Sequence, residues 1–102
     1  MIYELRHYAI HPGKMSEFSK RFEETPMKLL EKYGAKVIGV WQTRIGPGPE
    51  VVYILAFNDL AHREKVLDAM YQDDEFLKYM PNAQVASYNI RILRPLSFSP
   101  LK

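Results

Sequence analysis

Four stretches of the chain alternate between two kinds of side chain, as β-strands do. They are residues 2–10, 36–45, 51–57 and 88–93. In the last stretch Ile90 and Ile92 alternate with Asn89 and Arg91. Because successive side chains of a strand point to opposite faces, these stretches predict strands whose two faces differ in chemistry.

The two predicted faces differ in polarity and in aromatic content. One is mainly small and aliphatic, which suits packing against helices. The other carries Glu4, Arg6, Tyr8, Trp41, Thr43, Tyr53, Phe57, Asn89 and Arg91. This set is too aromatic for a solvated surface and too charged for an ordinary core. We therefore expect helices on the aliphatic face, and a shared, partly hydrated cavity at a dimer interface on the other.

The segment between the first two strands has the periodicity of a helix. Apolar residues recur there at three- and four-residue steps, beginning at Met15. Pro26 lies inside this segment and predicts a kink, because proline removes a backbone donor. Gly34 is expected to end the helix in a positive-φ cap.

Two further helices are predicted between the third and fourth strands. Asn58-Asp59 is expected to supply the N-cap of a helix over residues 60–70. The acidic residues 73–75 suit the start of a shorter helix that Pro81 ends. Glycines and prolines at residues 46–49 predict the hairpin connection between the two middle strands.

The resulting order, βαββαβ, is typical of a ferredoxin-like α+β fold with a four-stranded antiparallel sheet and helices on one side. A chain of 102 residues corresponds to one domain, residues 1–102. Two such domains that stack their uncovered sheet faces about a twofold axis would form a homodimer, a dimeric α/β-barrel.

Composition narrows the classes of function. The chain has no cysteine, so disulfides, thiolate metal sites and cysteine nucleophiles are excluded, and a cytoplasmic location is expected. It has no run of about 18 apolar residues, which predicts no membrane span. Its net charge of +2 comes from interspersed acidic and basic residues, which argues against nucleic acid as a partner.

Several short segments, in this order and spacing, are similar to those of one known family. They are Ile2-Tyr3-Glu4-Leu5-Arg6, His11-Pro12-Gly13-Lys14, Leu30-Glu31-Lys32-Tyr33-Gly34, Gly39 with Trp41, Asp59-Leu60-Ala61-His62-Arg63 and Ile92-Leu93-Arg94-Pro95. Over essentially its whole length the chain resembles the NIPSNAP family. The resemblance implies a dimeric α/β-barrel, from a superfamily that also holds cofactor-independent monooxygenases, haem-degrading enzymes and dehydratases. It implies no particular reaction and no set of catalytic residues.

Five side chains of the charged and aromatic face are candidates for ligand binding. They are Arg6, Tyr8, Trp41, Asn89 and Arg91. Arginines hold carboxylate, enol or phenolate oxygens through planar bidentate contacts, so the expected ligand is a small anionic or aromatic metabolite. Glu4 has the alternative role of pairing with an arginine across the strands or across the dimer.

No metal site or cofactor is expected. His7, His11 and His62 lack the spacing of metal ligands, and the chain has no nucleotide-binding motif. Two hypotheses for function remain open at this point. One is a dimeric protein with a small-molecule-binding or cofactor-independent monooxygenase-like pocket, and the other is a non-catalytic dimeric interaction module.

Overall fold

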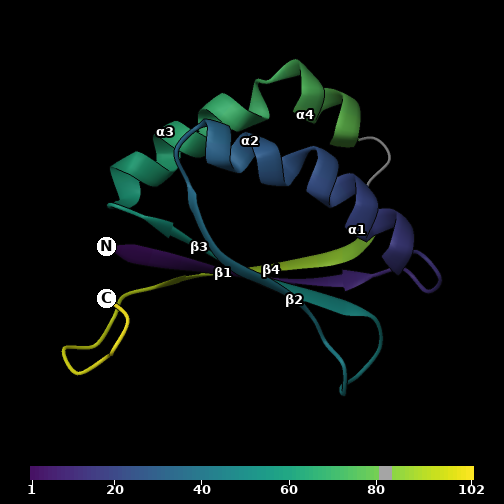
Figure 1. Cartoon of the computed structure of the whole chain (residues 1–102), viewed down its shortest axis with the longest axis horizontal. Helices are drawn as coiled ribbons and strands as arrows, with labels where there is room; N and C mark the ends of the chain where they lie inside the picture. The colour runs from purple at the N-terminus through teal and green to yellow at the C-terminus, as the bar shows by residue number, and fades with distance from the viewer. Residues whose placement is uncertain (81–83) are drawn as a thin grey trace.

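The computed structural model describes residues 1–80 and 84–102 (Figure 1). The strands are β1 (Ile2–Ile10), β2 (Lys36–Gln42), β3 (Glu50–Phe57) and β4 (Val85–Leu93). The helices are α1 (Met15–Glu24), α2 (Pro26–Lys32), α3 (Leu60–Tyr71) and α4 (Asp74–Tyr79). The predicted order of elements is confirmed. β2 ends before the predicted residue 45, and β4 begins before the predicted residue 88.

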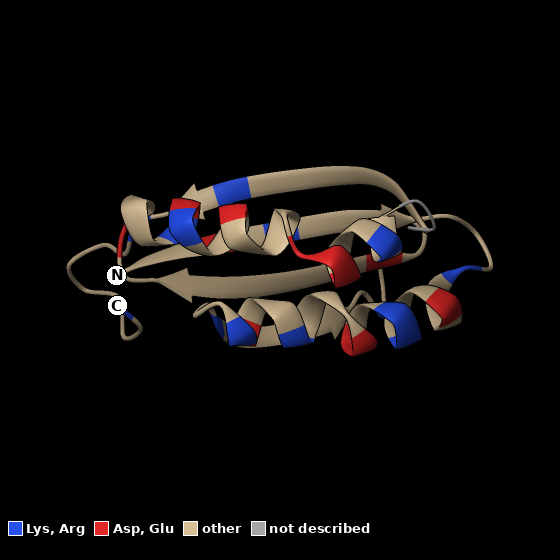
Figure 2. Cartoon of the chain, turned by 90° about the horizontal axis from the view of Figure 1, so that it is seen from above, with Lys and Arg blue, Asp and Glu red and all other residues tan. Residues whose placement is uncertain are grey.

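The strands form one antiparallel sheet in the order β2-β3-β1-β4. All four helices arch over the same face of this sheet and leave its other face open (Figure 1). The predicted ferredoxin-like α+β arrangement is therefore confirmed. The outer surfaces of the helices carry interspersed acidic and basic residues (Figure 2), as expected for faces in contact with water.

The helices cover the face of the sheet that we expected to be open. Glu4, Arg6 and Tyr8 are buried, and so are Tyr53 and Phe57, which are only 2% and 1% exposed. Large rings gain most from burial, and the apolar stripes of the helices pack on the face that carries them. The predicted orientation of the first and third strands was wrong for this reason.

Because of the strand register, the residues predicted to share one face lie on two different faces of the sheet. In β4, Ile90 lies opposite Arg6, so Asn89 and Arg91 point to the open face. In β2 the register shifts between Val37 and Gly39, so that Val40 lies opposite Tyr53 and Trp41 opposite Val52. This bulge breaks the period of two and turns Trp41 to the open face.

The predicted helix positions are confirmed where the structure describes them, except that the one helix expected to kink at Pro26 is divided into two. Helices α1 and α2 are separated at Thr25, directly before Pro26. Gly34 follows α2 with a φ of +106°. Asp59 caps α3 by accepting a hydrogen bond from the backbone N–H of His62 at 2.8 Å. The predicted stop at Pro81 lies outside the described residues.

Candidate functional site

A cavity of about 310 Å³ lies between the helices and the β3-β1-β4 part of the sheet. It is lined by Arg6, Tyr8, Phe22, Pro26, Leu30, Tyr53, Met70, Tyr71, Phe76, Tyr79, Met80, Val85, Tyr88 and Ile90. The residues from β1 and β3 are buried, whereas Tyr88 and Ile90 at the edge strand are 51% and 43% exposed. The cavity therefore has a buried floor and a more exposed side along β4.

Arg6 places a charged group in this otherwise aromatic and aliphatic cavity. It is only 6% exposed. Its Nε donates to Oε2 of Glu4 at 2.5 Å, and its Nη1 donates to the hydroxyl oxygen of Tyr8 at 2.9 Å. Its Nη2 is buried and has no hydrogen-bond partner among residues 1–80 and 84–102. A buried donor without a partner is costly, which makes this atom the strongest indication of a ligand.

Glu4 connects the floor of the cavity to helix α3. It is fully buried, with an exposed fraction of 0%. One of its carboxylate oxygens accepts from Arg6, and the other accepts from Nε of Arg63. One buried carboxylate thus balances two guanidinium groups, and the cluster of Glu4, Arg6 and Arg63 retains a net positive charge.

The pKa of Arg6 is raised above its ordinary value. Burial alone would lower it, but the electrostatic interactions with Tyr53, Tyr8 and Glu4 outweigh the effect of burial. Arginine is already charged at any physiological pH, and this environment keeps it so. The floor of the cavity is therefore permanently cationic.

Tyr53, Tyr79 and Tyr88 stay protonated at neutral pH. Burial raises the pKa of Tyr53 well above its usual range, raises that of Tyr79 to about 12 and also raises that of Tyr88. The hydroxyls of Tyr8 and Tyr53 lie 2.7 Å apart and share a hydrogen bond. The rings thus supply neutral hydroxyls and apolar surface, while Arg6 supplies the charge.

The structure separates the five residues predicted to line one cavity. Arg6 and Tyr8 line it. Trp41, Asn89 and Arg91 lie on the open face of the sheet, as the strand pairing shows. The prediction that all five share a cavity was therefore wrong, because it assumed one common face for β1, β2 and β4.

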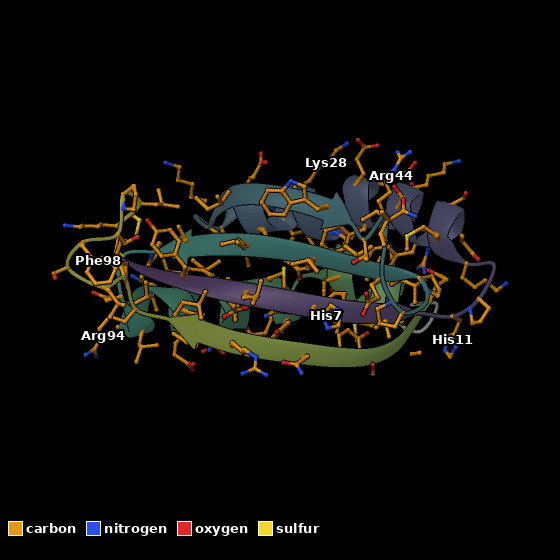
Figure 3. All side chains as sticks on the ribbon, turned by 90° about the horizontal axis from the view of Figure 1, so that it is seen from below. His7, His11, Lys28, Arg44, Arg94 and Phe98 are labelled. Carbon is orange, nitrogen blue, oxygen red and sulfur yellow. The ribbon has the colours of Figure 1, made fainter. Side chains whose placement is uncertain are left out.

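The open face carries a different set of groups. His7 projects from β1 on this face (Figure 3), and its Nε2 lies 2.6 Å from Oε2 of Glu50. Trp41 is 53% exposed, and its ring lies where a side chain at Gly39 would be. Leu93 at the end of β4 is 39% exposed. This face thus combines exposed apolar area with a contact between a histidine and a carboxylate, and with the charged side chain of Arg91.

The three histidines have separate local surroundings. His62 accepts from the backbone N–H of Asn58 through Nδ1 at 2.9 Å, and its ring contacts Phe57 edge-on. His11 lies in the turn after β1, where its backbone N–H donates to the carbonyl oxygen of Gln84. Within the described ranges, no three His, Asp or Glu side chains are grouped as metal ligands would be.

Sequence reasoning missed Arg63 and the contribution of α4 to the cavity. The order of the strands and helices indicates where Arg63 lies. The last residue of β3, Phe57, pairs with Ile2 at the start of β1, and α3 begins directly after β3. The first turn of α3 must therefore lie near Glu4, where an arginine finds a buried acidic partner.

Comparison with known proteins agrees with this fold and extends over the whole chain. The NIPSNAP family model matches residues 3–100. Protein NipSnap homolog 3A of Homo sapiens is 31% identical over 77 residues, which are 74% of this chain and 30% of that protein. The chain spans about a third of the length of the curated relatives it matches, with 35% for human NipSnap homolog 2. In the described part of the chain, no helix is long and apolar enough to cross a membrane.

Solved structures give the same result. A NIPSNAP family protein from Agrobacterium tumefaciens has a TM-score of 0.92 at 30% identity, covering 99% of this chain and 98% of that one. An antibiotic biosynthesis monooxygenase has a TM-score of 0.62 at 16% identity, covering 94% of this chain and 99% of that one, and shares the fold alone. On the match of the family model over residues 3–100, the chain belongs to the NIPSNAP family.

Proposed function

We propose that this protein binds a small apolar or aromatic molecule with an anionic oxygen end in the cavity beneath the helices. One observation carries the proposal. Arg6 lines a cavity whose other walls are rings and aliphatic side chains, and its Nη2 is buried, charged and without a partner among the described residues. A ligand oxygen placed there restores the missing hydrogen bond.

The charge of the cluster favours an anion over a neutral ligand. Glu4 is shared by Arg6 and Arg63, so it does not neutralise both of them. A guanidinium forms its strongest hydrogen bonds with carboxylate, phenolate or enolate oxygens. A weakly acidic phenol or enol bound at this point would be stabilised as its anion, with its proton released to solvent.

The size and lining of the cavity suit a compact aromatic body. Its volume of about 310 Å³ lies at the lower end of the range for small-molecule sites. Tyr79 and Tyr88 offer ring faces, and the exposed positions of Tyr88 and Ile90 offer a route of entry along β4. A monooxygenase-like pocket would oxygenate such a bound anion with dioxygen and without a cofactor. A measurement of oxygen uptake would detect this reaction.

Two matched probes test the binding proposal by calorimetry, 2-naphthoate and its neutral isostere 2-naphthamide. We expect wild-type protein to prefer the carboxylate, and Arg6→Gln to lose about 1.5 to 3 kcal/mol of carboxylate binding, the value of a charged hydrogen bond. Arg91→Gln on the open face is the control and should bind as wild type does. Equal affinity of wild-type protein for both probes would reject the proposal.

The folding of Arg6→Gln is checked in the same titrations. The amide probe makes no charged contact, so a folded variant should still bind 2-naphthamide as wild type does. Arg6→Lys provides a second variant, which keeps the charge and should retain part of the preference for the carboxylate. If the preference for the carboxylate is lost in Arg6→Gln but retained in Arg6→Lys, the positive charge of residue 6 is the source of the preference.

We also propose that a second copy of the chain covers the open face of the sheet. The exposed Trp41 and Leu93, together with the partly buried Leu5, Val52 and Ile54, form an apolar face that water contacts in the single chain. Such faces on soluble proteins mark interaction sites, and a twofold axis lets one face serve both partners.

Light scattering tests the dimer. We expect a dimeric mass at micromolar concentration for wild-type protein and a shift towards monomer for Trp41→Asp, which adds an unpaired charge to the interface. Ile45→Asp is the matched control, because Ile45 is 92% exposed in the loop between β2 and β3. A monomeric wild-type protein would rule out this interface, while leaving the cavity proposal intact.

A further inference from the structure

Among the described residues, Nη2 of Arg6 has no partner because of the way in which two arginines share the carboxylate of Glu4. Nε and Nη2 lie on the same edge of a guanidinium, and a carboxylate that faces this edge normally bonds to both atoms with its two oxygens. Here Oε2 of Glu4 accepts from Nε of Arg6 at 2.5 Å, while Nη2 is left unbonded. The second oxygen of Glu4 is engaged elsewhere.

Arg63 is the residue that engages it. Its Nε donates to Oε1 of Glu4, and it approaches from α3. A carboxylate oxygen turned towards Arg63 is not available to complete a two-point contact with Arg6. The two arginines therefore compete for one carboxylate.

We infer that Arg63 is a positioning residue, which leaves Nη2 of Arg6 unpaired by holding back the second oxygen of Glu4, so that a ligand oxygen that reaches Nη2 finds no competing acceptor. This inference rests on the function proposed above and names the residue that sets the anion preference of the cavity. Arg63 is not among the residues that line the cavity where the structure describes it, so it acts through Glu4 rather than by touching the ligand.

The charges lead to the same result. With Arg63 in place, one buried carboxylate faces two cations, and Arg6 retains an uncompensated share of positive charge. Without Arg63, Glu4 and Arg6 form a neutral pair, and the cavity loses its attraction for anions. Glu64 also contacts Arg63, at 3.3 Å, but its side chain is 69% exposed, and water screens its charge.

The binding test uses 2-naphthoate and 2-naphthamide with Arg63→Gln. We expect the ratio of carboxylate to amide affinity to fall at least tenfold, with amide binding unchanged. Arg63→Lys should restore most of the ratio, because a lysine can still hold Oε1 of Glu4. Lys65→Gln removes a positive charge from the same helix without contacting Glu4, and it should leave the ratio as in wild type.

A measurement without ligand separates this inference from the proposed function. Nitrogen-15 NMR of the arginine side chains reports the Nε and Nη2 protons of Arg6. We expect the Nη2 protons, which are buried but make no hydrogen bond in wild-type protein, to exchange faster there than in Arg63→Gln, where Glu4 closes on both atoms. Arg63→Lys should retain the wild-type exchange.

The outcomes are distinct. If wild-type protein shows no preference for the carboxylate, the proposed function fails, and the NMR experiment still tests the role of Arg63. If wild-type protein shows the preference and Arg63→Gln retains it, the role assigned to Arg63 is wrong. Unchanged exchange of the Nη2 protons in Arg63→Gln would overturn that role by itself.

Discussion

Glu4 and Arg6 lie two residues apart on β1, on the face covered by the helices, and a hydrogen bond of 2.5 Å joins Arg6 Nε to Glu4 Oε2. Neighbouring positions on one face of a strand rarely hold opposite charges inside a core, because burial of charge is costly unless it is paired. Here the pair is anchored by Arg63 and Tyr8, and it forms the polar floor of an apolar cavity.

Replacement of Glu4 should strongly destabilise the fold. Glu4→Gln leaves Arg6 as a buried cation without its counterion, and loss of one member of such a pair typically costs about 3 to 5 kcal/mol. Urea unfolding at neutral pH measures the loss of free energy of unfolding. Glu64→Gln, at an exposed partner of Arg63, should change the free energy of unfolding by less than about 0.5 kcal/mol. Similar values for the two variants would contradict this account of Glu4.

Stability should fall at alkaline pH because of Tyr79. Burial raises the pKa of its hydroxyl from 10.0 to about 12, so the folded protein holds this proton more tightly than the unfolded chain. The resulting stabilisation is complete below pH 10 and is lost as the pH rises towards 12. Tyr79→Phe should flatten the decline in free energy of unfolding over this interval, as measured by urea unfolding at several pH values. An identical decline in both proteins would exclude Tyr79 as its source.

A hydrogen bond between Tyr33 and Asp73 should stabilise the protein against acid. The hydroxyl of Tyr33 donates to Oδ2 of Asp73 at 2.5 Å, and Oδ1 accepts from the backbone N–H of Glu75. These two bonds, the first being the larger effect, lower the pKa of Asp73 below 3.8. The stabilisation is present above pH 3.8 and is lost as the pH falls through the lowered pKa.

Tyr33→Phe tests this bond. We expect the pKa of Asp73 to rise towards 3.8 in the variant, as followed by NMR titration of its carboxyl carbon. Tyr71→Phe, at a tyrosine that is 43% exposed, serves as the control and should leave the titration of Asp73 unchanged. A titration curve unaffected by Tyr33→Phe would show that the backbone of Glu75 and the side chain of Lys32, rather than Tyr33, set the pKa.

Gly39 should be required for the position of Trp41. A Cβ atom at Gly39 would lie 2.5 Å from Cη2 and Cζ2 of the indole, which is far closer than atoms approach. Gly39→Ala should therefore displace the ring and change its fluorescence, which the single tryptophan of the chain reports without ambiguity. Gly46→Ala, in the loop after β2, is the control, because its added Cβ would meet the side chain of Thr43 and not the indole. Unaltered emission in Gly39→Ala would show that the ring lies elsewhere in solution.

Local sequence was sufficient for the elements and their order. Alternation with a period of two identified the strands, and Asn58-Asp59 and Gly34 marked helix ends where the structure has them. The kink predicted at Pro26 lies where the structure separates α1 from α2. These signals depend on the backbone conformation of a few neighbouring residues, so they can be read without knowledge of the fold. The βαββαβ order then restricted the topology to the arrangement that the structure shows.

The tertiary structure decided which face of each strand the helices cover. Alternation divides the side chains of a strand into two sets, but it does not relate the sets of one strand to those of the next. That relation depends on register, which places Ile90 rather than Asn89 opposite Arg6, and on the bulge in β2, which turns Trp41 away from Tyr53. A shift of one residue reverses a whole strand, so the cavity residues could be named from the sequence only in part.

The role of Arg63 illustrates the same limit. Arg6 was identified from the sequence as a charged residue in a strand of alternating pattern, because that property is local. Arg63 lies 59 positions from Glu4 and meets it only because β3 pairs with β1 and leads directly into α3. The sequence by itself determined that a buried arginine needs a hydrogen-bond partner. The path of the chain in space determined that two arginines share the carboxylate of Glu4, and that neither oxygen of this carboxylate bonds to Nη2 of Arg6.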